Sequence, residues 1–215
     1  MPAEIVRINS QNPEPRLIAY TAEQIRGGAV VGMPTDTFYG LAADPLNLRA
    51  VEQIYFLKTR SKHKPLSLMV ESVDQAEDLA RPQSAEFYAL ARKYWPGPLT
   101  MIVRASSRLP LKVTANTGNV ALRVPACTIA LEVVRAAGLP ITATSANVSG
   151  ASESTTVEGV REQLGFQLPL IVDGGPTPRA VPTTILDLSS GDGRWRLIRE
   201  GAIAKKEIAE YLGEQ

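Results

Sequence analysis

The chain has 215 residues, of which 44% are hydrophobic and 21% are charged, which is enough apolar material for one sizeable core. Its 23 Lys and Arg residues nearly balance its 22 Asp and Glu residues, and the resulting net charge of +1 excludes a disordered chain and a histone-like basic protein. The single cysteine, Cys127, excludes an internal disulfide and a Cys-rich zinc site, and it fits a reducing compartment such as the cytoplasm.

The N-terminal residues 1–12 interleave apolar and charged side chains, so they lack the apolar centre of a signal peptide. A membrane-spanning helix needs roughly 18 or more consecutive apolar residues, and the chain contains no such run. We therefore expect a cytoplasmic protein with no membrane segment.

Short apolar and β-branched runs alternate with helical patterns along the chain. The predicted strands, in chain order, are Glu4–Ile8, Ala29–Met33, Leu66–Val70, Leu99–Val103, Val120–Val124, Pro140–Ala143, Leu168–Val172, Thr183–Leu188 and Trp195–Arg199. Together with the helices between them, they predict an α/β (α+β) fold with one open, twisted, mixed sheet and flanking helices. Residues 1–215 contain no linker-like stretch, so we expect a single domain.

Helix ends are marked by capping residues. Thr21 with Gln24 and Ser72 with Gln75 have the spacing of a capping box, in which each side chain binds a backbone N–H of the first turn. Four further helices are predicted. One begins after Asn47, and a second begins after Ser84 and stops near Trp95-Pro96-Gly97-Pro98. A third runs over Thr128–Ala137 and closes at Gly138, and the last runs over Ala204–Leu212.

The charges are distributed unevenly. Residues 49–64 contain five cations and one acid, a net charge of +4, and residues 87–131 contain six cations and no acid. Each stretch alone is typical of a solvated face, whereas the two together favour a shared site for anions.

Three polar segments are candidates for chemistry. Residues 34–41 and 142–150 place hydroxyl, carboxylate and amide groups just past a predicted strand, where open sheets bind ligands, although self-contained turns explain the same patterns. Residues 58–66 carry four cations within seven positions, which exceeds what one helix end requires and favours phosphate binding. The chain contains no Gly-x-x-x-x-Gly-Lys phosphate loop, so a nucleotide must be held by side chains and irregular loops.

Arg123 lies within an apolar strand, where a charge requires either a carboxylate partner or a cavity, and the sequence leaves both open. His63 is the single histidine, so a His-dependent relay is not expected and a solvated loop position is favoured.

Taken in chain order, these pieces resemble one family. The matching motifs are Thr35-Asp36-Thr37-x-Tyr39-Gly40-Leu41, Lys58-x-Arg60 with Pro65-Leu66, Trp95-Pro96-Gly97-Pro98-Leu99-Thr100, Arg123-Val124-Pro125 and Ser145-Ala146-Asn147. Their order and spacing resemble the YrdC/TsaC family of threonylcarbamoyl-AMP synthases over residues 28–201, in the short form without an additional C-terminal domain.

This resemblance implies a YrdC-like domain with a deep basic cavity and a reaction of L-threonine, bicarbonate and ATP that releases pyrophosphate. It also implies Mg²⁺ on the ATP phosphates, no metal ligands from the protein, and downstream proteins that transfer the threonylcarbamoyl group to tRNA next to the anticodon. A weak direct contact with tRNA is a further expectation. The physical requirement is that two anions, carbamate and triphosphate, are held together and aligned.

The resemblance assigns roles by position. Lys58 and Arg60 are the expected catalytic residues. The expected ATP ligands are Arg60, Lys64, Ser145, Asn147 and Arg199. The expected threonine ligands are Thr37, Arg123 and Thr183, with Arg123 on the carboxylate. The residues indicate no dedicated general base beyond Asp36 as a candidate.

The chain departs from the family pattern at several positions. Ser61 replaces a common Pro, Met69 replaces a frequent threonine-contacting His, Thr183 replaces Ser and Glu200 replaces Pro. Two other functions stay open: a divergent family member that acts as an RNA-binding module, and a carbamoyl-adenylate domain of hydrogenase maturation. The near-neutral charge argues against the first, and the lack of zinc-finger-like cysteines argues against the second.

Overall fold

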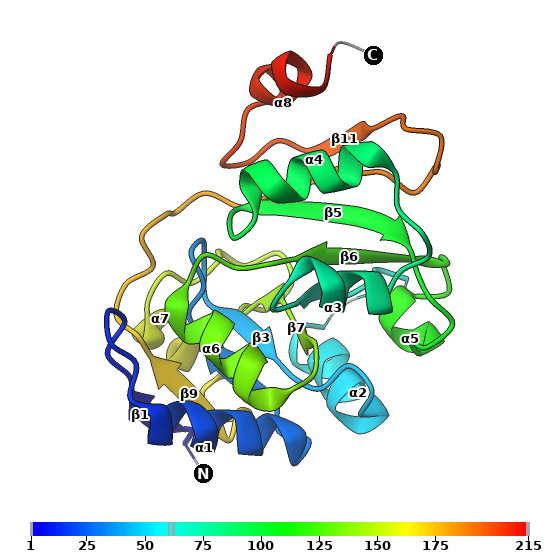
Figure 1. The fold of residues 1–215 in the computed structure, drawn as a ribbon. Coiled ribbons are helices and arrows are strands. Elements are labelled where there is room, and N and C mark those ends of the chain that lie inside the picture. Colours follow the sequence, from blue (N-terminus) through cyan, green and yellow to red (C-terminus); the bar gives the residue numbers. More distant parts are fainter. Residues whose placement is uncertain (1, 60, 62, 214–215) are drawn as a thin grey trace.

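The computed structural model describes residues 2–59, 61 and 63–213, whose strands form two mixed sheets (Figure 1). The first sheet has the order β1 (Glu4–Arg7), β9 (Leu170–Asp173), β2 (Val31–Met33), β3 (Gly40–Ala42) and β8 (Thr144–Ser145). The second has the order β11 (Arg196–Arg199), β10 (Thr184–Asp187), β5 (Leu99–Arg104), β6 (Asn119–Arg123), β4 (Ser67–Met69) and β7 (Ile141–Thr142).

The α/β class is confirmed, but the expected single sheet is divided into two. The predicted strand 140–143 is where the chain changes sheets: β7 pairs with β4 in the second sheet, and β8 pairs with β3 in the first. Thr142 supports the crossing because its hydroxyl donates to Leu41 O at 2.8 Å. Apolar alternation identifies a strand but not its partners, so the sequence could not reveal this division.

Eight helices in the described residues surround the sheets. They are α1 (Pro15–Arg26), α2 (Leu48–Leu57), α3 (Val73–Asp78), α4 (Ala85–Tyr94), α5 (Leu111–Thr114), α6 (Thr128–Ala137), α7 (Val157–Leu164) and α8 (Lys205–Leu212). None of the described helices is long and apolar enough to cross a membrane.

Most predicted helix ends are confirmed. Asn47 accepts from the backbone of the first turn of α2, Ser72 accepts from Gln75 N at 3.2 Å, and Gly138 closes α6 at a φ of +66°. The box predicted at Thr21 is wrong, because α1 begins at Pro15, whose ring favours the first position of a helix. Thr21 is instead buried inside α1, where its hydroxyl donates to Leu17 O at 2.8 Å.

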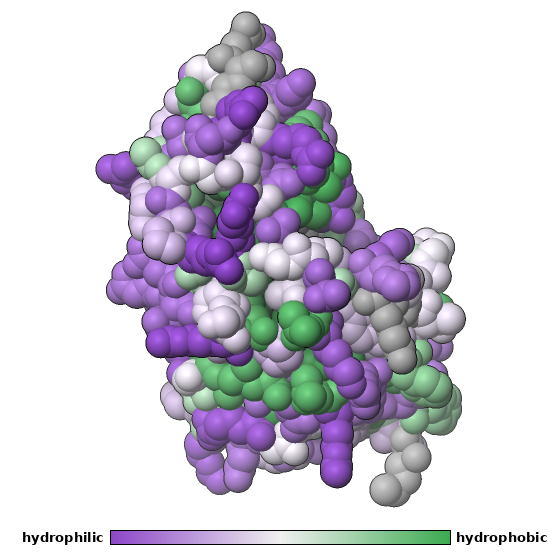
Figure 2. Space-filling view, turned by 90° about the vertical axis from the view of Figure 1, so that its right-hand side faces the viewer, coloured by the Kyte–Doolittle hydropathy of each residue, from purple (hydrophilic) through white to green (hydrophobic). Residues whose placement is uncertain are grey.

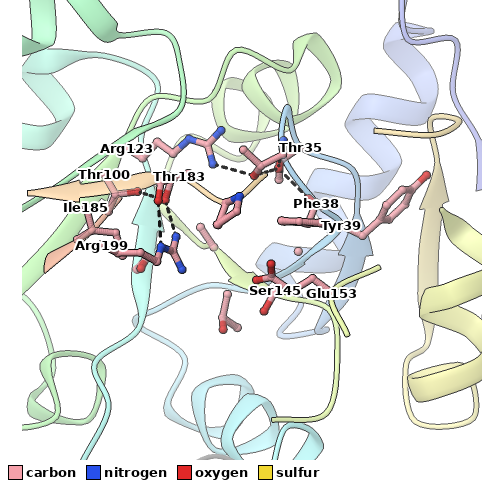
Figure 3. Close-up of a pocket in the computed structure, with 16 residues that line it drawn as sticks. Thr35, Phe38, Tyr39, Thr100, Arg123, Ser145, Glu153, Thr183, Ile185 and Arg199 are labelled. Atoms are coloured by element: carbon pink, nitrogen blue, oxygen red, sulfur yellow. Dashed lines mark hydrogen bonds between the residues drawn. The ribbon is translucent and has the colours of Figure 1, made fainter. Parts of the chain in front are cut away.

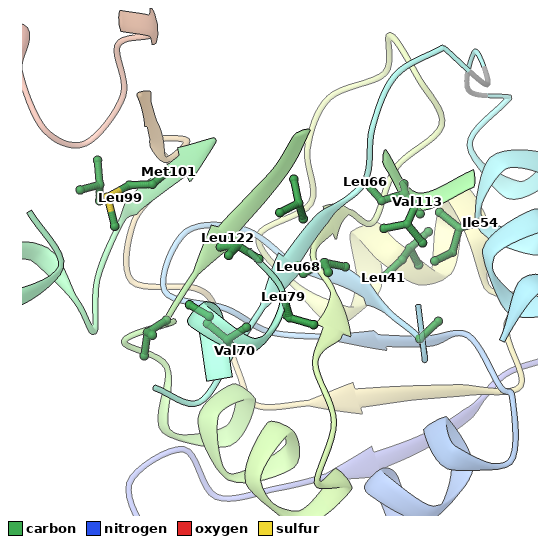
Figure 4. Packing of buried hydrophobic residues seen from close by; sticks show 14 of the residues in the cluster. Leu41, Ile54, Leu66, Leu68, Val70, Leu79, Leu99, Met101, Val113 and Leu122 are labelled. Atoms are coloured by element: carbon green, nitrogen blue, oxygen red, sulfur yellow. The ribbon is translucent and has the colours of Figure 1, made fainter. Parts of the chain in front are cut away.

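Two apolar clusters hold the fold together. In the larger one, side chains from both sheets meet those of α2 and α5, with Leu41, Leu122, Ile54 and Val113 as examples (Figure 4). The smaller cluster joins α1 and α6 to one face of the first sheet. Because α7 covers the other face through Val160, strands β2, β3 and β9 are buried throughout and lack alternation.

Candidate functional site

A cavity of about 200 Å³ opens where the two sheets meet (Figure 3). Four strands of the second sheet contribute residues at one end. β5 and β10 are parallel and begin at this end, whereas their neighbours β6 and β11 are antiparallel to them and finish there. The first sheet contributes the β2–β3 connection and β8. The lining consists of Thr35, Thr37, Phe38, Tyr39, Gly40, Ser67, Thr100, Arg123, Ala143, Thr144, Ser145, Glu153, Pro182, Thr183, Ile185 and Arg199.

The β2–β3 connection is shaped by its own threonines. The Thr35 hydroxyl donates to Phe38 O at 2.7 Å and accepts from Thr37 N at 3.1 Å. Tyr39 is fully buried, and its hydroxyl donates to Gly175 O at 2.8 Å. Burial raises the pKa of Tyr39 above its ordinary value of 10.0, so the phenol stays neutral and serves as an anchor for this loop.

Arg123, the last residue of β6, forms a buried ion pair with Asp36. Each residue is 5% exposed. The Arg123 Nε donates to Gly97 O at 2.9 Å, and Nη1 lies 3.4 Å from the Thr37 hydroxyl. Burial lowers the pKa of Arg123 and the Asp36 carboxylate opposes this shift, so the guanidinium stays charged at neutral pH.

Asp36 faces away from the cavity described above. Its Oδ1 accepts from Arg123 and from Ala126 N at 3.1 Å, whereas its buried Oδ2 has no hydrogen-bond partner among the described residues. Asp36 is not among the residues that line the cavity. Its carboxylate therefore positions Arg123 and the loop after β6, which argues against the general-base assignment.

Arg199 is held at the opposite wall by Thr183. Its Nε donates to Thr183 O at 3.0 Å and its Nη2 to the Thr183 hydroxyl at 2.9 Å, while the Thr100 hydroxyl donates to the same Thr183 oxygen at 3.0 Å. Burial lowers the pKa of Arg199, and the Glu153 carboxylate opposes the shift. The guanidinium is thus oriented before any ligand arrives.

Lys58 organises the loop that contains Ser145 and Asn147. Its ammonium donates to the backbone oxygens of both residues and to Asn147 Oδ1, at 3.0 Å for the last. Lys58 is 2% exposed, and Asn147 is 5% exposed with its Nδ2 donating to Ala151 O at 2.6 Å. Neither residue is among those that line the cavity, which favours a positioning role for both, while the catalytic role of Lys58 and the ATP contact of Asn147 stay predictions.

Five of the predicted site residues are brought together in this one cavity: Thr37, Arg123, Thr183, Ser145 and Arg199. Lys64 is exposed and lies outside the lining, and Arg60 lies outside the described residues. Met69 is fully buried in the smaller apolar cluster, so it contributes to packing.

Glu153 is the main residue that the sequence did not reveal. It follows the Ser145-Ala146-Asn147 motif in a Ser- and Thr-rich stretch whose composition is typical of a turn. Its place in the cavity lining becomes apparent only in the tertiary structure. Among the described residues, no group of three or more His, Cys, Asp or Glu side chains could hold a metal ion.

Two mixed sheets with a hydroxyl-lined, arginine-bearing cavity at their junction define an α/β protein suited to binding anionic ligands. A family model described as "Telomere recombination" (Sua5/YciO/YrdC) matches residues 23–201. The chain belongs to the Sua5/YciO/YrdC family.

Individual relatives agree with this assignment. The threonylcarbamoyl-AMP synthase of Bacillus subtilis (strain 168) is 40% identical over 197 residues, which are 91% of this chain and 56% of that protein. The crystal structure of Pyrococcus abyssi Sua5 complexed with L-threonine has a TM-score of 0.94 and 35% identity, covering 99% of this chain and 62% of that one. The crystal structure of Escherichia coli YciO has a TM-score of 0.86 and 26% identity, covering 96% of this chain and 99% of that one. The chain thus spans little more than half the length of the first two relatives.

Proposed function

We propose that this protein is a threonylcarbamoyl-AMP synthase, a nucleotidyltransferase that converts L-threonine, bicarbonate and ATP into L-threonylcarbamoyladenylate and pyrophosphate. The observation that carries the proposal is the cavity that unites Arg123, Thr37 and Thr183 with Ser145 and Arg199. The B. subtilis relative of that name and the threonine complex of the P. abyssi protein support it.

The chemistry balances without a covalent enzyme intermediate. The threonine ammonium group loses a proton, and the resulting amine combines with bicarbonate to form a carbamate and water. A carbamate oxygen then attacks the α-phosphorus of ATP as the bond to the β-phosphate breaks, and pyrophosphate leaves. Such a reaction depends mainly on alignment of the reactants and on screening of their charges.

In this proposal the two arginines serve different anions. Arg123, held by Asp36 and Gly97 O, turns its Nη1 edge toward Thr37 and binds the threonine carboxylate. Arg199, held by Thr183, binds the nucleotide. Thr183, which contacts Arg199 and Thr100 in the cavity wall, keeps its proposed role in binding threonine.

Ser145 takes part directly in nucleotide binding, whereas Lys58 and Asn147 act as positioning residues for its loop. Arg60 and Lys64 retain their proposed phosphate role from their place in the Lys58-x-Arg60 motif. Mg²⁺, when bound, screens the phosphate charges. The product is passed to proteins that modify tRNA in the cytoplasm.

The test is release of pyrophosphate from ATP by the purified protein. We expect release only when L-threonine and bicarbonate are both present, and without any RNA. Equal turnover in the absence of threonine would refute the substrate assignment. Binding of RNA without pyrophosphate release, weakening steeply with salt, would indicate the RNA-binding alternative.

A further inference from the structure

The cavity holds one acidic side chain among the described residues that line it, and this is Glu153. Figure 3 shows Glu153 and Arg199 on opposite sides of the cavity, with Ser145 on the same side as Glu153. Asp36, the nearest acid in the sequence motifs, is committed to Arg123 and lies outside the lining. Glu153 is therefore the single carboxylate that the described lining residues contribute to the cavity.

The backbone on both sides of Glu153 is anchored. Ser152 O accepts from the Gln163 side chain of α7 at 3.0 Å, and Ser154 O accepts from Tyr39 N at 2.8 Å. Ser154 is itself 5% exposed, and the Gln163 side chain also accepts from Val148 N at 3.2 Å. Glu153 is thus presented to the cavity from a segment tied to α7 and to the start of β3.

A carboxylate at this place is unfavourable for a bare triphosphate. The charge of Arg123 is already balanced by Asp36, so Arg199 is the remaining cation of the described lining, and Glu153 opposes it. Within the described lining, the triphosphate of ATP would meet one guanidinium and one like charge in a confined space, where charges interact more strongly than in water. The like charge of Glu153 would also offset part of the attraction proposed for Arg60 and Lys64.

A divalent cation resolves this conflict. Mg²⁺ prefers oxygen ligands, keeps several of its waters, and is usually bound by one or two carboxylates together with substrate phosphates. The described residues offer no cluster of three acidic or metal-binding side chains, so a preformed metal cage is absent from that part of the chain. One carboxylate that faces the proposed phosphate site, together with the phosphate oxygens, matches the usual ligands of a Mg²⁺ ion bound to a nucleotide.

We propose that Glu153 is the protein's carboxylate ligand, direct or through a metal-bound water, for the Mg²⁺ that enters on the nucleotide phosphates. This inference rests on the proposed function, because it assumes that ATP occupies the cavity. In the absence of nucleotide, Glu153 balances the charge of Arg199. With nucleotide bound, Glu153 would hold the metal, and Arg199, kept in place by Thr183, would face the phosphates.

The test is calorimetric binding of α,β-methylene-ATP, which cannot be cleaved at the reacting bond, in Mg²⁺ and in EDTA. In the wild-type protein Mg²⁺ strengthens binding. The gain is the ratio of the affinity in Mg²⁺ to the affinity in EDTA. In Glu153→Gln we expect this ratio to be about 10- to 100-fold smaller than in the wild type, as is typical when a carboxylate that supports a metal is lost. Binding in EDTA becomes equal or tighter, because the like charge is removed. A loss of affinity in Mg²⁺ together with an equal or higher affinity in EDTA distinguishes a metal ligand from a residue that merely supports the fold.

Two controls complete the design. Glu162→Gln removes the same charge from an exposed position on α7 and should leave both titrations unchanged. Glu153→Asp keeps the charge on a shorter side chain and should keep part of the Mg²⁺ gain. L-threonine binding, measured separately, should be the same in Glu153→Gln and wild type, which also shows that the variant is folded.

The outcomes are distinct. A Mg²⁺ gain that is unchanged in Glu153→Gln overturns the metal role while leaving the proposed function intact. A loss of threonine affinity with an unchanged Mg²⁺ gain also overturns it and assigns Glu153 to the threonine amine. Failure of the wild-type protein to bind either threonine or the nucleotide analogue overturns the proposed function itself.

Discussion

The ammonium of Lys58 lies 2.9 Å from the backbone oxygen of Asn147 and 3.0 Å from its side-chain oxygen, in a site that is closed to solvent. A lysine from the end of α2 thereby shapes the loop that carries Ser145 into the cavity. The ammonium donates to the protein's own carbonyl groups, and the Asn147 side-chain amide in turn donates to Ala151 O.

Replacing Lys58 by Met tests this arrangement. The change keeps most of the side-chain volume but removes the ammonium donor from the backbone and side-chain oxygens of Asn147, while Ser145 O keeps, among the described residues, only its bond from Asn147 N at 3.0 Å. Each unsatisfied buried polar group costs about 1–3 kcal/mol, so we expect the free energy of unfolding to fall by about 3 kcal/mol in urea titrations. Lys205→Met, at an exposed position, should change it by less than about 0.5 kcal/mol. A Lys58 variant as stable as the wild type would show that the ammonium does not hold the loop.

The buried pair of Arg123 and Asp36 predicts strong coupling. Arg123→Met leaves the Asp36 carboxylate buried without its partner, and such changes typically cost about 3–5 kcal/mol. Adding Asp36→Asn should recover part of that loss, because the uncompensated charge disappears. The measurement is a double-mutant cycle of unfolding free energies. Additive losses would mean that the two side chains are energetically independent.

The Arg199 side chain lies at the cavity wall and is only partly buried, so its loss should affect activity far more than stability. Arg199→Gln removes the cation that we propose binds the nucleotide, and hydrogen bonds to charged groups contribute about 1.5–3 kcal/mol. We therefore expect the kcat/KM for ATP to fall by at least about tenfold while the melting temperature stays within a few degrees. Arg196→Gln, on the same strand but outside the cavity lining, is the matched control. Equal loss in both variants would contradict the assignment.

Cys127 should react slowly in the folded protein. Burial raises the pKa of its thiol above the ordinary value of 9.0, although N–H groups of the first turn of α6 oppose the shift. A raised pKa means less of the reactive thiolate at any given pH. Alkylation by iodoacetamide at pH 8 should therefore be slower in folded than in urea-unfolded protein, and the folded rate should still rise beyond pH 9. A folded rate that matches the unfolded one would disprove the protection.

Local signals in the sequence predicted the parts of the fold that depend on near neighbours. Asn47, Ser72 and Gly138 mark helix ends because a side chain or a left-handed backbone satisfies groups within the same turn. Thr21 has the same spacing and no cap, because Pro15 begins the helix earlier. The short elements β3, α5 and β8, and the helix α7, escaped prediction because tertiary pairing and packing define them more than their own residues do.

The sequence by itself determined the class of fold, the order of the motifs, and the residue types that an anion site requires. The tertiary structure decided which of those residues line the cavity. Arg123 and Arg199 reach one cavity because β6 and β11, separated by β5 and β10, run in the same direction and end on the same side of the second sheet. Lys58 and Asn147 instead form a hydrogen bond behind the cavity wall. A side chain's role depends on where desolvation and pairing leave its charge, and that balance is set only when distant segments pack together.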